Sequence, residues 1–179
     1  KSVNEFSLES VQEYNWSEKF NQKIDLRLSS NNYDDQTLKK IGLPENSWFV
    51  CLHVRESGFH NDKGRRDFRN ANILNYIPAI KEITSRGGWV VRMGDQTMKP
   101  LPRMKNVIDY PFTKYKSDFM DLCLIQNCRF FFGDTSGVGA VAHLFHKNRL
   151  LTNIHNWGFE ISHQRDRGIL MHVYSKKRE

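Results

Sequence analysis

The chain has 179 residues, which is enough for one ordinary domain and short for two. Hydrophobic residues make up 39% of it, but no run approaches ~18 consecutive apolar residues, so no membrane-spanning helix is expected. The net charge of +7 is compatible with a polyanionic partner such as a nucleotide phosphate, a nucleic acid or an anionic membrane surface, although a generally basic surface is the simpler interpretation.

Residues 1–45 are polar with helix-like patches, and we predict them to be a helical N-terminal segment that ends near Gly42. Residues 46–179 are predicted to form one Rossmann-like domain. The three cysteines, Cys51, Cys123 and Cys128, lack CxxC spacing, and Cys51 sits inside an apolar run. Unpaired buried thiols and the absence of a signal-peptide pattern predict a cytoplasmic protein.

From Trp48 onward, short apolar runs alternate with longer amphipathic segments. The pattern predicts strands over 48–54, 89–93, 106–110, 129–133 and 149–153, and helices over 71–88, 117–128 and 136–147. Pro78 predicts a kink or an early break in the first of these helices. Buried strands separated by helices predict an α/β fold with a parallel sheet, helices on both faces and right-handed crossovers.

Polar residues follow each predicted strand. Since the carboxyl ends of parallel strands meet at one edge of the sheet, these residues are expected to line one ligand crevice. The candidate ligand-binding residues at these ends are His53, Arg55, Glu56, Arg92, Asp95, Thr135, Ser136, Gly137 and Asn153.

The segment "GDTSGVGA" follows a strand and opens a helix. Its small residues let the backbone approach a ligand, and the free amides of a helix start favour an anion. Ser136 is also a good helix cap, which is a purely structural role. The segment lacks the Lys–Ser/Thr ending of a P-loop and the full dinucleotide fingerprint. Phosphate binding and simple turn-and-cap chemistry both stay open, with phosphate binding slightly favoured.

His53 and Arg55 are two residues apart, so on a strand they project to the same face. At a strand end, an arginine presents a planar fork of donors to a phosphate. The alternative is a structural ion pair of Arg55 with Asp95 or Glu56. The ligand role is favoured for Arg55, while for His53 ligand binding and a structural hydrogen bond are equally open.

Two further features surround these strand ends. The loop over 57–70 carries the cations Lys63, Arg65, Arg66 and Arg69, which suggest a clamp beside an anion, although an exposed basic loop is the usual interpretation. Asp118 and Asp121 share one helical face and either bind a sugar hydroxyl or complement the helix dipole. The histidines and acids show no metal-ligand spacing, so we predict a site without metal or other cofactor.

The ordered segments "HVRESGFH", "YIPAIKEITSRGGWVVRMGD", "SDFMDLCLIQNCRFFFGDTSGVGAVAHLF" and "LLTN" resemble the nucleotide-binding half of a GT-B glycosyltransferase. They resemble most a bacterial family associated with surface polysaccharide clusters. The layout is also similar to that of fucosyltransferases with an HxRR-type motif at a strand end. The resemblance covers about residues 48–153.

The resemblance implies that Arg55 grips the sugar-nucleotide diphosphate, with His53 beside it. It also implies that Thr135, Ser136 and Gly137 offer hydroxyl and backbone donors to phosphate. Glu56 stands where a second arginine is common, which leaves the donor nucleotide and the sugar open. A GT-B enzyme has two Rossmann-like halves, and this chain supplies one, of the C-terminal type.

The leading hypothesis is therefore a metal-independent glycosyltransferase, or its donor-binding domain, in surface polysaccharide or glycan synthesis. It would move a sugar from a nucleoside-diphosphate donor to a glycan or lipid-linked acceptor, with a peripheral membrane contact allowed by the charge. Arg55 and Glu56 are the predicted catalytic residues, Arg55 on the leaving diphosphate and Glu56 as general base unless an absent domain supplies that acid. The predicted substrate-binding residues are His53, Arg92, Asp95, Asp118, Thr135, Ser136, Gly137 and Asn153.

The alternative hypothesis is a non-catalytic nucleotide- or phosphosugar-binding domain on the same fold. A nucleic-acid-binding module ranks last, because the sequence has no RNP-like, KH or zinc-knuckle signature. No nucleic acid partner is therefore predicted.

Overall fold

In a computed structural model of the chain, the described residues are 28, 35–58, 67–155 and 165–172. Most of the predicted N-terminal helical segment, and Lys63, Arg65 and Arg66 of the basic loop, lie outside these ranges. Of the segment over 1–45, helix α2 (Asp35–Lys40) is described. Ile41 and Leu43, which follow α2, are buried in the same core as the sheet.

The described residues form a six-stranded sheet in the order β3-β2-β1-β4-β5-β6, and every neighbouring pair is parallel. The strands are β1 (Phe49–His53), β2 (Trp89–Arg92), β3 (Val107–Asp109), β4 (Phe130–Asp134), β5 (Arg149–Ile154) and β6 (Arg167–Leu170). The remaining α-helices are α3 (Ile77–Ser85), α4 (Asp118–Asn127) and α5 (Gly137–Leu144), and three 3-10 helices are η2 (Asp67–Arg69), η3 (Ile73–Tyr76) and η4 (Tyr110–Phe112).

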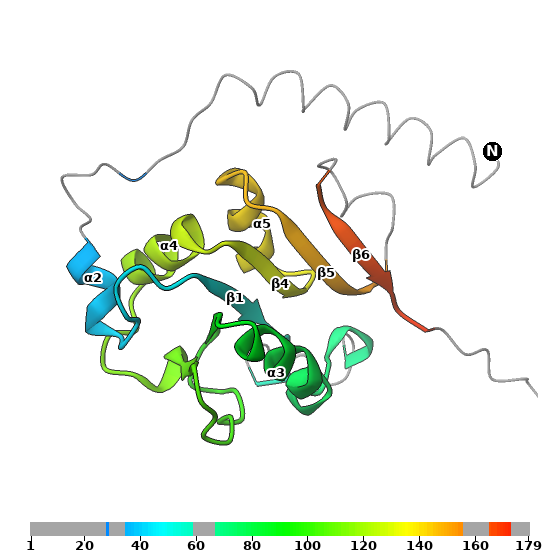
Figure 1. Ribbon diagram of the computed structural model, residues 1–179. Helices are drawn as coiled ribbons and strands as arrows, with labels where there is room; N and C mark the ends of the chain where they lie inside the picture. Colours follow the sequence, from blue (N-terminus) through cyan, green and yellow to red (C-terminus); the bar gives the residue numbers. More distant parts are fainter. Residues whose placement is uncertain (1–27, 29–34, 59–66, 156–164, 173–179) are drawn as a thin grey trace, which may run out of the picture.

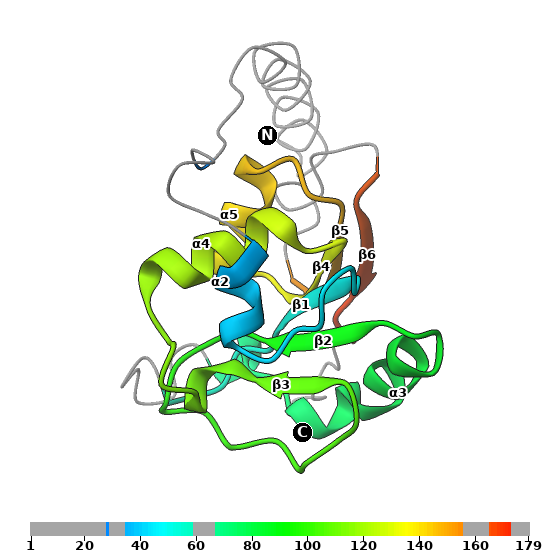
Figure 2. The same ribbon diagram turned by 60° about the vertical axis from the view of Figure 1, so that its left-hand side comes forward.

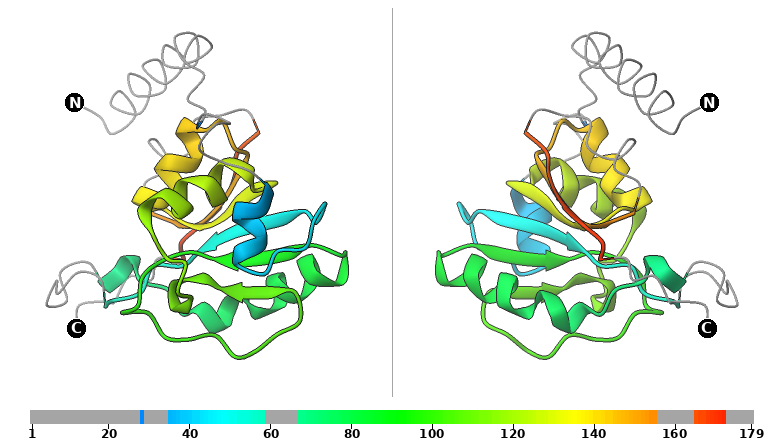
Figure 3. Two further views of the ribbon diagram at one scale, coloured as in Figure 1. Left: turned by 90° about the vertical axis from the view of Figure 1, so that its left-hand side faces the viewer. Right: turned by 90° about the vertical axis from the view of Figure 1, so that its right-hand side faces the viewer.

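Helices cover both faces of the sheet (Figures 1 and 2): α2, α4 and α5 lie on one face, and α3 lies on the other. The two views of Figure 3 show the same layers from the sides. Alternate residues of β1 serve the two cores, with Phe49 and Cys51 in the core under α4 and Val50 and Leu52 in the core under α3. This arrangement confirms the predicted α/β, Rossmann-like fold.

The strand order reverses direction between β1 and β4, which is the topological switch point of a doubly wound sheet. At this point the two strands lie so close that a glycine is required. Gly133 pairs with His53, has a φ of +145°, and a Cβ built on it would stand 1.8 Å from the His53 carbonyl oxygen. The close pairing of Gly133 with His53 therefore fixes the end of β1 relative to the start of the "GDTSG" turn.

Two predicted elements differ from the observed ones. The helix expected over 71–88 is split into η3 and α3, and Pro78 takes the second position of α3, where its missing N–H costs nothing. The strand β6 was not predicted, because "RGIL" is short and mostly exposed and so carries no buried apolar run. The predicted helix caps Ser117 and Ser136 are confirmed, each accepting a backbone N–H at 3.2 Å.

Candidate functional site

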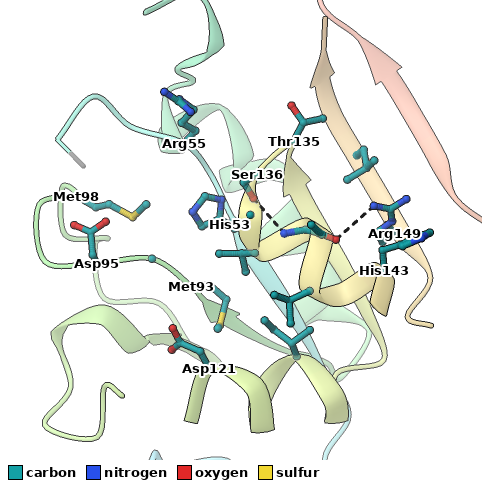
Figure 4. Close-up of a pocket in the computed structure, with 18 of the residues that line it drawn as sticks. His53, Arg55, Met93, Asp95, Met98, Asp121, Thr135, Ser136, His143 and Arg149 are labelled. Atoms are coloured by element: carbon teal, nitrogen blue, oxygen red, sulfur yellow. Dashed lines mark hydrogen bonds between the residues drawn. The ribbon is translucent and has the colours of Figure 1, made fainter. Parts of the chain in front are cut away.

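A cavity of about 1000 Å³ opens on the face of the sheet that α4 and α5 cover (Figure 4). It lies beside the switch point, where parallel α/β sheets bind ligands. The end of β1, the loop after β2, the start of α4 and the β4–α5 turn all contribute to its wall. The polar residues of that wall are His53, Arg55, Glu56, Arg69, Asp95, Lys116, Asp118, Asp121, Thr135, Ser136, His143 and Arg149.

The backbone at Arg55 is fixed by a buried carboxylate. Asp134, only 2% exposed, accepts the Arg55 backbone N–H at 2.9 Å and the hydroxyl groups of Tyr76 and Thr152. Burial raises the pKa of the Asp134 carboxyl, while its hydrogen bonds oppose that shift. The Asp134 carboxylate thus joins the Arg55 backbone to Tyr76 and Thr152, and these bonds fix the position of the chain as it leaves β1. The Arg55 side chain is half-buried and donates from Nε to Asn70 Oδ1 at 3.2 Å.

His53 lies in the cavity wall beside Ser136 (Figure 4). Its side chain is 92% buried by area, and its Nδ1 has no hydrogen-bond partner among the described residues. Burial, followed by the positive charge of Arg92, lowers the pKa of His53 to about 4. The imidazole is therefore neutral near pH 7 and keeps an unused polar atom next to the cavity.

The start of α5 presents backbone amides at the cavity. Ser136 Oγ accepts the Gly139 N–H and the Ser136 carbonyl accepts the Ala140 N–H, so the amides of Gly137 and Val138 have no partner within the helix. A Cβ built on Gly137 would meet no atom within 4 Å. The backbone is therefore open to a ligand here, and the positive end of the helix dipole favours an anion.

Arg69, at the end of η2, also reaches the cavity. It donates from Nη2 to the Thr135 carbonyl at 3.3 Å, and its Nε is buried without a partner among the described residues. The neighbouring Phe68 ring lies edge-on to His155, with 5.5 Å between centroids. Sequence reasoning placed Arg69 in a basic loop but did not select it.

Acidic and apolar side chains line the rest of the wall. Asp118 and Asp121 project from the first turn of α4, and Asp121 forms an ion pair with Lys116. Its Oδ1 is buried without a partner among the described residues. The apolar residues of the wall include Met93, Met98, Leu122, Ile125, Val138 and Val141, and Met93 lies between Asp121 and His53 (Figure 4). The cavity wall thus combines cationic, apolar and acidic side chains.

Arg92 lies elsewhere. Its side chain has no exposed area and does not line the cavity. Instead Nη2 bonds Glu56 Oε1 at 3.0 Å and Nη1 bonds Asp109 Oδ1 at 3.0 Å and the Lys99 carbonyl at 2.7 Å. A buried guanidinium needs such partners, and this set satisfies Nη1 and Nη2 without a ligand, while Nε is buried without a partner among the described residues. These bonds explain the position of Arg92 in the fold, and its predicted substrate-binding role has no support from the cavity wall and stays a prediction.

Glu56 touches the cavity but is already engaged. In addition to the Arg92 ion pair, its Oε2 accepts the Lys99 backbone N–H at 2.8 Å. The sequence left open an ion pair between Glu56 and Arg55. In the structure the described ion-pair partner of Glu56 is Arg92. The general-base role of Glu56 stays a prediction.

Asn153 also lies outside the cavity wall. It has a φ of +57° at a register shift between β5 and β6, a backbone conformation that asparagine tolerates better than most residues. Its position thus has a local backbone explanation. Asp95 does line the cavity, and its Oδ1 accepts the Thr97 N–H at 2.7 Å within its own turn.

Of the ten predicted site residues, the structure brings eight to one cavity: His53, Arg55, Glu56, Asp95, Asp118, Thr135, Ser136 and Gly137. Their binding roles stay predictions. The sequence indicated Arg69 only as one of four cations in a basic loop, and it did not indicate the supporting roles of Tyr76 and Asp134. Asp134 was visible as a strand-end acid. Tyr76 opens the segment "YIPAIKEITSRGGWVVRMGD", but nothing in the sequence indicated that η3 brings its hydroxyl to Asp134.

Within 35–58, 67–155 and 165–172 no group of three or more His, Cys, Asp or Glu side chains is arranged to hold a metal ion. None of the helices in those ranges has both the length and the apolar character needed to cross a membrane.

No protein-family model and no curated protein matches the chain. Among solved structures, the chain is similar to the bacterial iron-containing dodecameric glycosyltransferase TibC from enterotoxigenic E. coli H10407, with 14% sequence identity and a TM-score of 0.48. The match covers 77% of this chain and 34% of that one, so the chain spans about a third of its length. At this identity and TM-score, the similarity establishes neither an activity nor a ligand for this chain.

Proposed function

We propose that this chain is the donor-binding, Rossmann-like half of a metal-independent glycosyltransferase that uses a nucleoside-diphosphate sugar. One observation carries the proposal: Arg55 and the open amides at the start of α5 line one cavity at the switch point of the sheet. A guanidinium and a helix start on one cavity wall suit a diphosphate, because both offer donors to oxyanions.

In the proposed reaction, the bond between the anomeric carbon and the diphosphate oxygen breaks as the acceptor hydroxyl oxygen bonds that carbon. Negative charge then develops on the departing diphosphate. Arg55 and the amides of Gly137 and Val138 would stabilise that charge, since they are held in place before the reaction begins. The buried bonds of Asp134 support this role by fixing the backbone of Arg55.

The remainder of the cavity suits the remainder of a donor. The apolar part of the wall, with Met93 and Met98, offers a surface for a flat base or for the hydrophobic face of a sugar. The carboxylates of Asp118 and Asp121 would accept hydrogen bonds from ribose or sugar hydroxyls. The buried Oδ1 of Asp121, which has no partner among the described residues, supports a role as acceptor.

A second candidate function is a nucleotide- or phosphosugar-binding domain without transfer activity. Both carboxylate oxygens of Glu56 already accept hydrogen bonds, whereas a general base must accept a proton from the acceptor hydroxyl. This favours the binding domain without transfer activity. In the enzyme hypothesis, the same engagement favours a positioning role for Glu56, with the base supplied by another half of the protein.

The proposed function is tested by a thermal-shift screen of GDP-, UDP- and CMP-linked sugars, repeated in excess EDTA. We expect one nucleotide class to raise the melting temperature, because a ligand that binds only the folded state stabilises it. The shift is expected to survive EDTA. Release of nucleoside diphosphate in the presence of glycan acceptors would favour the enzyme, and binding without release would favour the second candidate. No stabilisation by any of the sugar nucleotides would contradict both.

A further inference from the structure

Arg69 is a second cation beside the proposed diphosphate position, and the role inferred for it rests on the proposed function. The sequence pattern left an unanswered question at this point, because Glu56 stands where similar motifs carry a second arginine. In the structure the Glu56 carboxylate is bound to Arg92 and to the Lys99 amide, so position 56 offers no donor to an anion. Another residue must supply the second guanidinium if there is one.

The segment around Arg69 is tied directly to Arg55. The Arg55 carbonyl accepts the Ala71 N–H at 2.9 Å, and Arg55 Nε donates to Asn70 Oδ1 at 3.2 Å. These two bonds hold residues 69–71 alongside the end of β1. Burial, followed by the positive charges of Arg69 and Arg55, lowers the pKa of His155, so both guanidinium groups act on the same ring.

Arg69 is also oriented by the turn that follows β4. Its Nη2 donates to the Thr135 carbonyl at 3.3 Å, and the same turn leads into the open amides of Gly137 and Val138. The Nε of Arg69 is buried and unpartnered within the described residues, as is the Nδ1 of the 92%-buried His53 in the same cavity wall. Buried polar atoms are normally satisfied, and two such atoms in one wall agree with a polar ligand there, although Arg92 Nε, away from the cavity, is also buried without a partner among the described residues.

We propose that Arg69 and Arg55 form a two-arginine clamp, in which Arg69 binds the second phosphate group of the nucleoside diphosphate. Arg55 and the start of α5 hold one phosphate group. Arg69, from the other side of the β4–α5 turn, holds the next one. Arg69 would therefore determine that the site prefers diphosphates to monophosphates, a preference that a single arginine with a helix start does not require.

The experiment is calorimetric titration of the chain with matched pairs of nucleotides, GDP and GMP, UDP and UMP, and ADP and AMP. The variants are Arg69→Ala and Arg69→Gln, of which the glutamine retains an N–H donor for the Thr135 carbonyl but removes the charge. Arg103→Ala is the control, because Arg103 is exposed and does not line the cavity. Thermal unfolding of each variant shows that it is folded.

For the nucleotide that binds best, we expect both Arg69 variants to weaken diphosphate binding about 10- to 100-fold, the range of a lost charge-assisted interaction. Monophosphate binding should change less than about threefold, and Arg103→Ala should change neither. A merely structural role for Arg69 would weaken both nucleotides equally, because the turn would be disturbed for each. Equal weakening, or no weakening, would overturn the clamp while leaving the proposed function intact. If the unaltered chain binds no nucleotide of the panel, the proposed function is contradicted and the clamp with it.

Discussion

Two arginine-centred regions lie close together at the carboxyl ends of the strands, and they use the same side chain in opposite ways. Around Arg92, the guanidinium is fully buried and bonded to Glu56, to Asp109 and to a backbone carbonyl. Around Arg55 and Arg69, the side chains line a cavity, and a helix start presents open amides.

The difference separates a structural arginine from a binding arginine without reference to sequence motifs. A guanidinium whose carboxylate partners neutralise it holds the fold together, and a ligand would have to displace those partners. A guanidinium that lines a cavity beside open backbone amides can still bind a ligand. The following changes test whether the two regions differ in this way.

The largest effect on stability is expected from Arg92→Met. Methionine fills a similar volume but leaves the carboxylates of Glu56 and Asp109 without their buried partner, so the free energy of unfolding should fall by about 3–5 kcal/mol. Denaturant unfolding measures this change. The matched control is Arg86→Met, since Arg86 is exposed in a helical pair with Glu82 and should change stability by less than about 1 kcal/mol. A loss for Arg92→Met no larger than that of the control would remove the structural half of the comparison.

The next effect concerns the pH dependence of stability and belongs to the binding region. The pKa of His53 is about 4 in the folded chain and is ordinarily 6.5, so between these values the unfolded chain takes up a proton that the folded chain does not. The stability contributed by the neutral imidazole is complete above pH 6.5 and is lost as the pH falls toward 4. The loss is on the order of 3 kcal/mol.

His53→Gln removes this titration. The difference between the unfolding free energies at pH 7 and pH 4 should therefore be smaller in the variant than in the unaltered chain, by about 3 kcal/mol. Identical pH dependence in the two proteins would mean that His53 is not held neutral by its surroundings. Binding of a phosphate anion beside the ring should also raise its pKa, so proton uptake is expected on nucleotide binding.

The smallest effect on the fold is expected from Gly137→Ala. Position 137 has room for a methyl group and a backbone that alanine can adopt, so the free energy of unfolding should stay the same or rise by up to about 1 kcal/mol. The methyl group would stand where the ligand approaches the α5 amides, and nucleotide affinity should fall roughly tenfold, or about 1.4 kcal/mol. Unchanged affinity in this variant would place the ligand away from the start of α5.

Strand periodicity predicted most of this fold, because buried parallel strands are continuous apolar runs. β1, β2, β4 and β5 each lie within about one residue of the predicted segments. β6 was missed for the converse reason, since an exposed edge strand has no such run. The caps Ser117 and Ser136 were predictable because capping is a local interaction.

The location of the site could be predicted from the sequence better than the contacts among its side chains. Strand-end positions brought Arg55, Ser136 and Asp118 to one cavity, as the topology requires. Which carboxylate pairs with which arginine depends on side-chain directions over tens of residues, and this is why the sequence did not indicate the pairing of Arg92 with Glu56 and Asp109. The position of Arg69 in the cavity wall was hard to predict for a similar reason, since it depends on bonds of Arg69, Asn70 and Ala71 to residues distant in the sequence.

The most direct test of the central claim is calorimetric titration of Arg55→Ala with the nucleoside diphosphate that binds the unaltered chain best. The substitution keeps the backbone N–H that Asp134 accepts, so the free energy of unfolding should change by less than about 1 kcal/mol. Affinity for the diphosphate should fall about 100-fold or more, because a charge-assisted pair of donors is removed. Full affinity in a folded Arg55→Ala protein would contradict the assignment of this cavity to a nucleoside diphosphate.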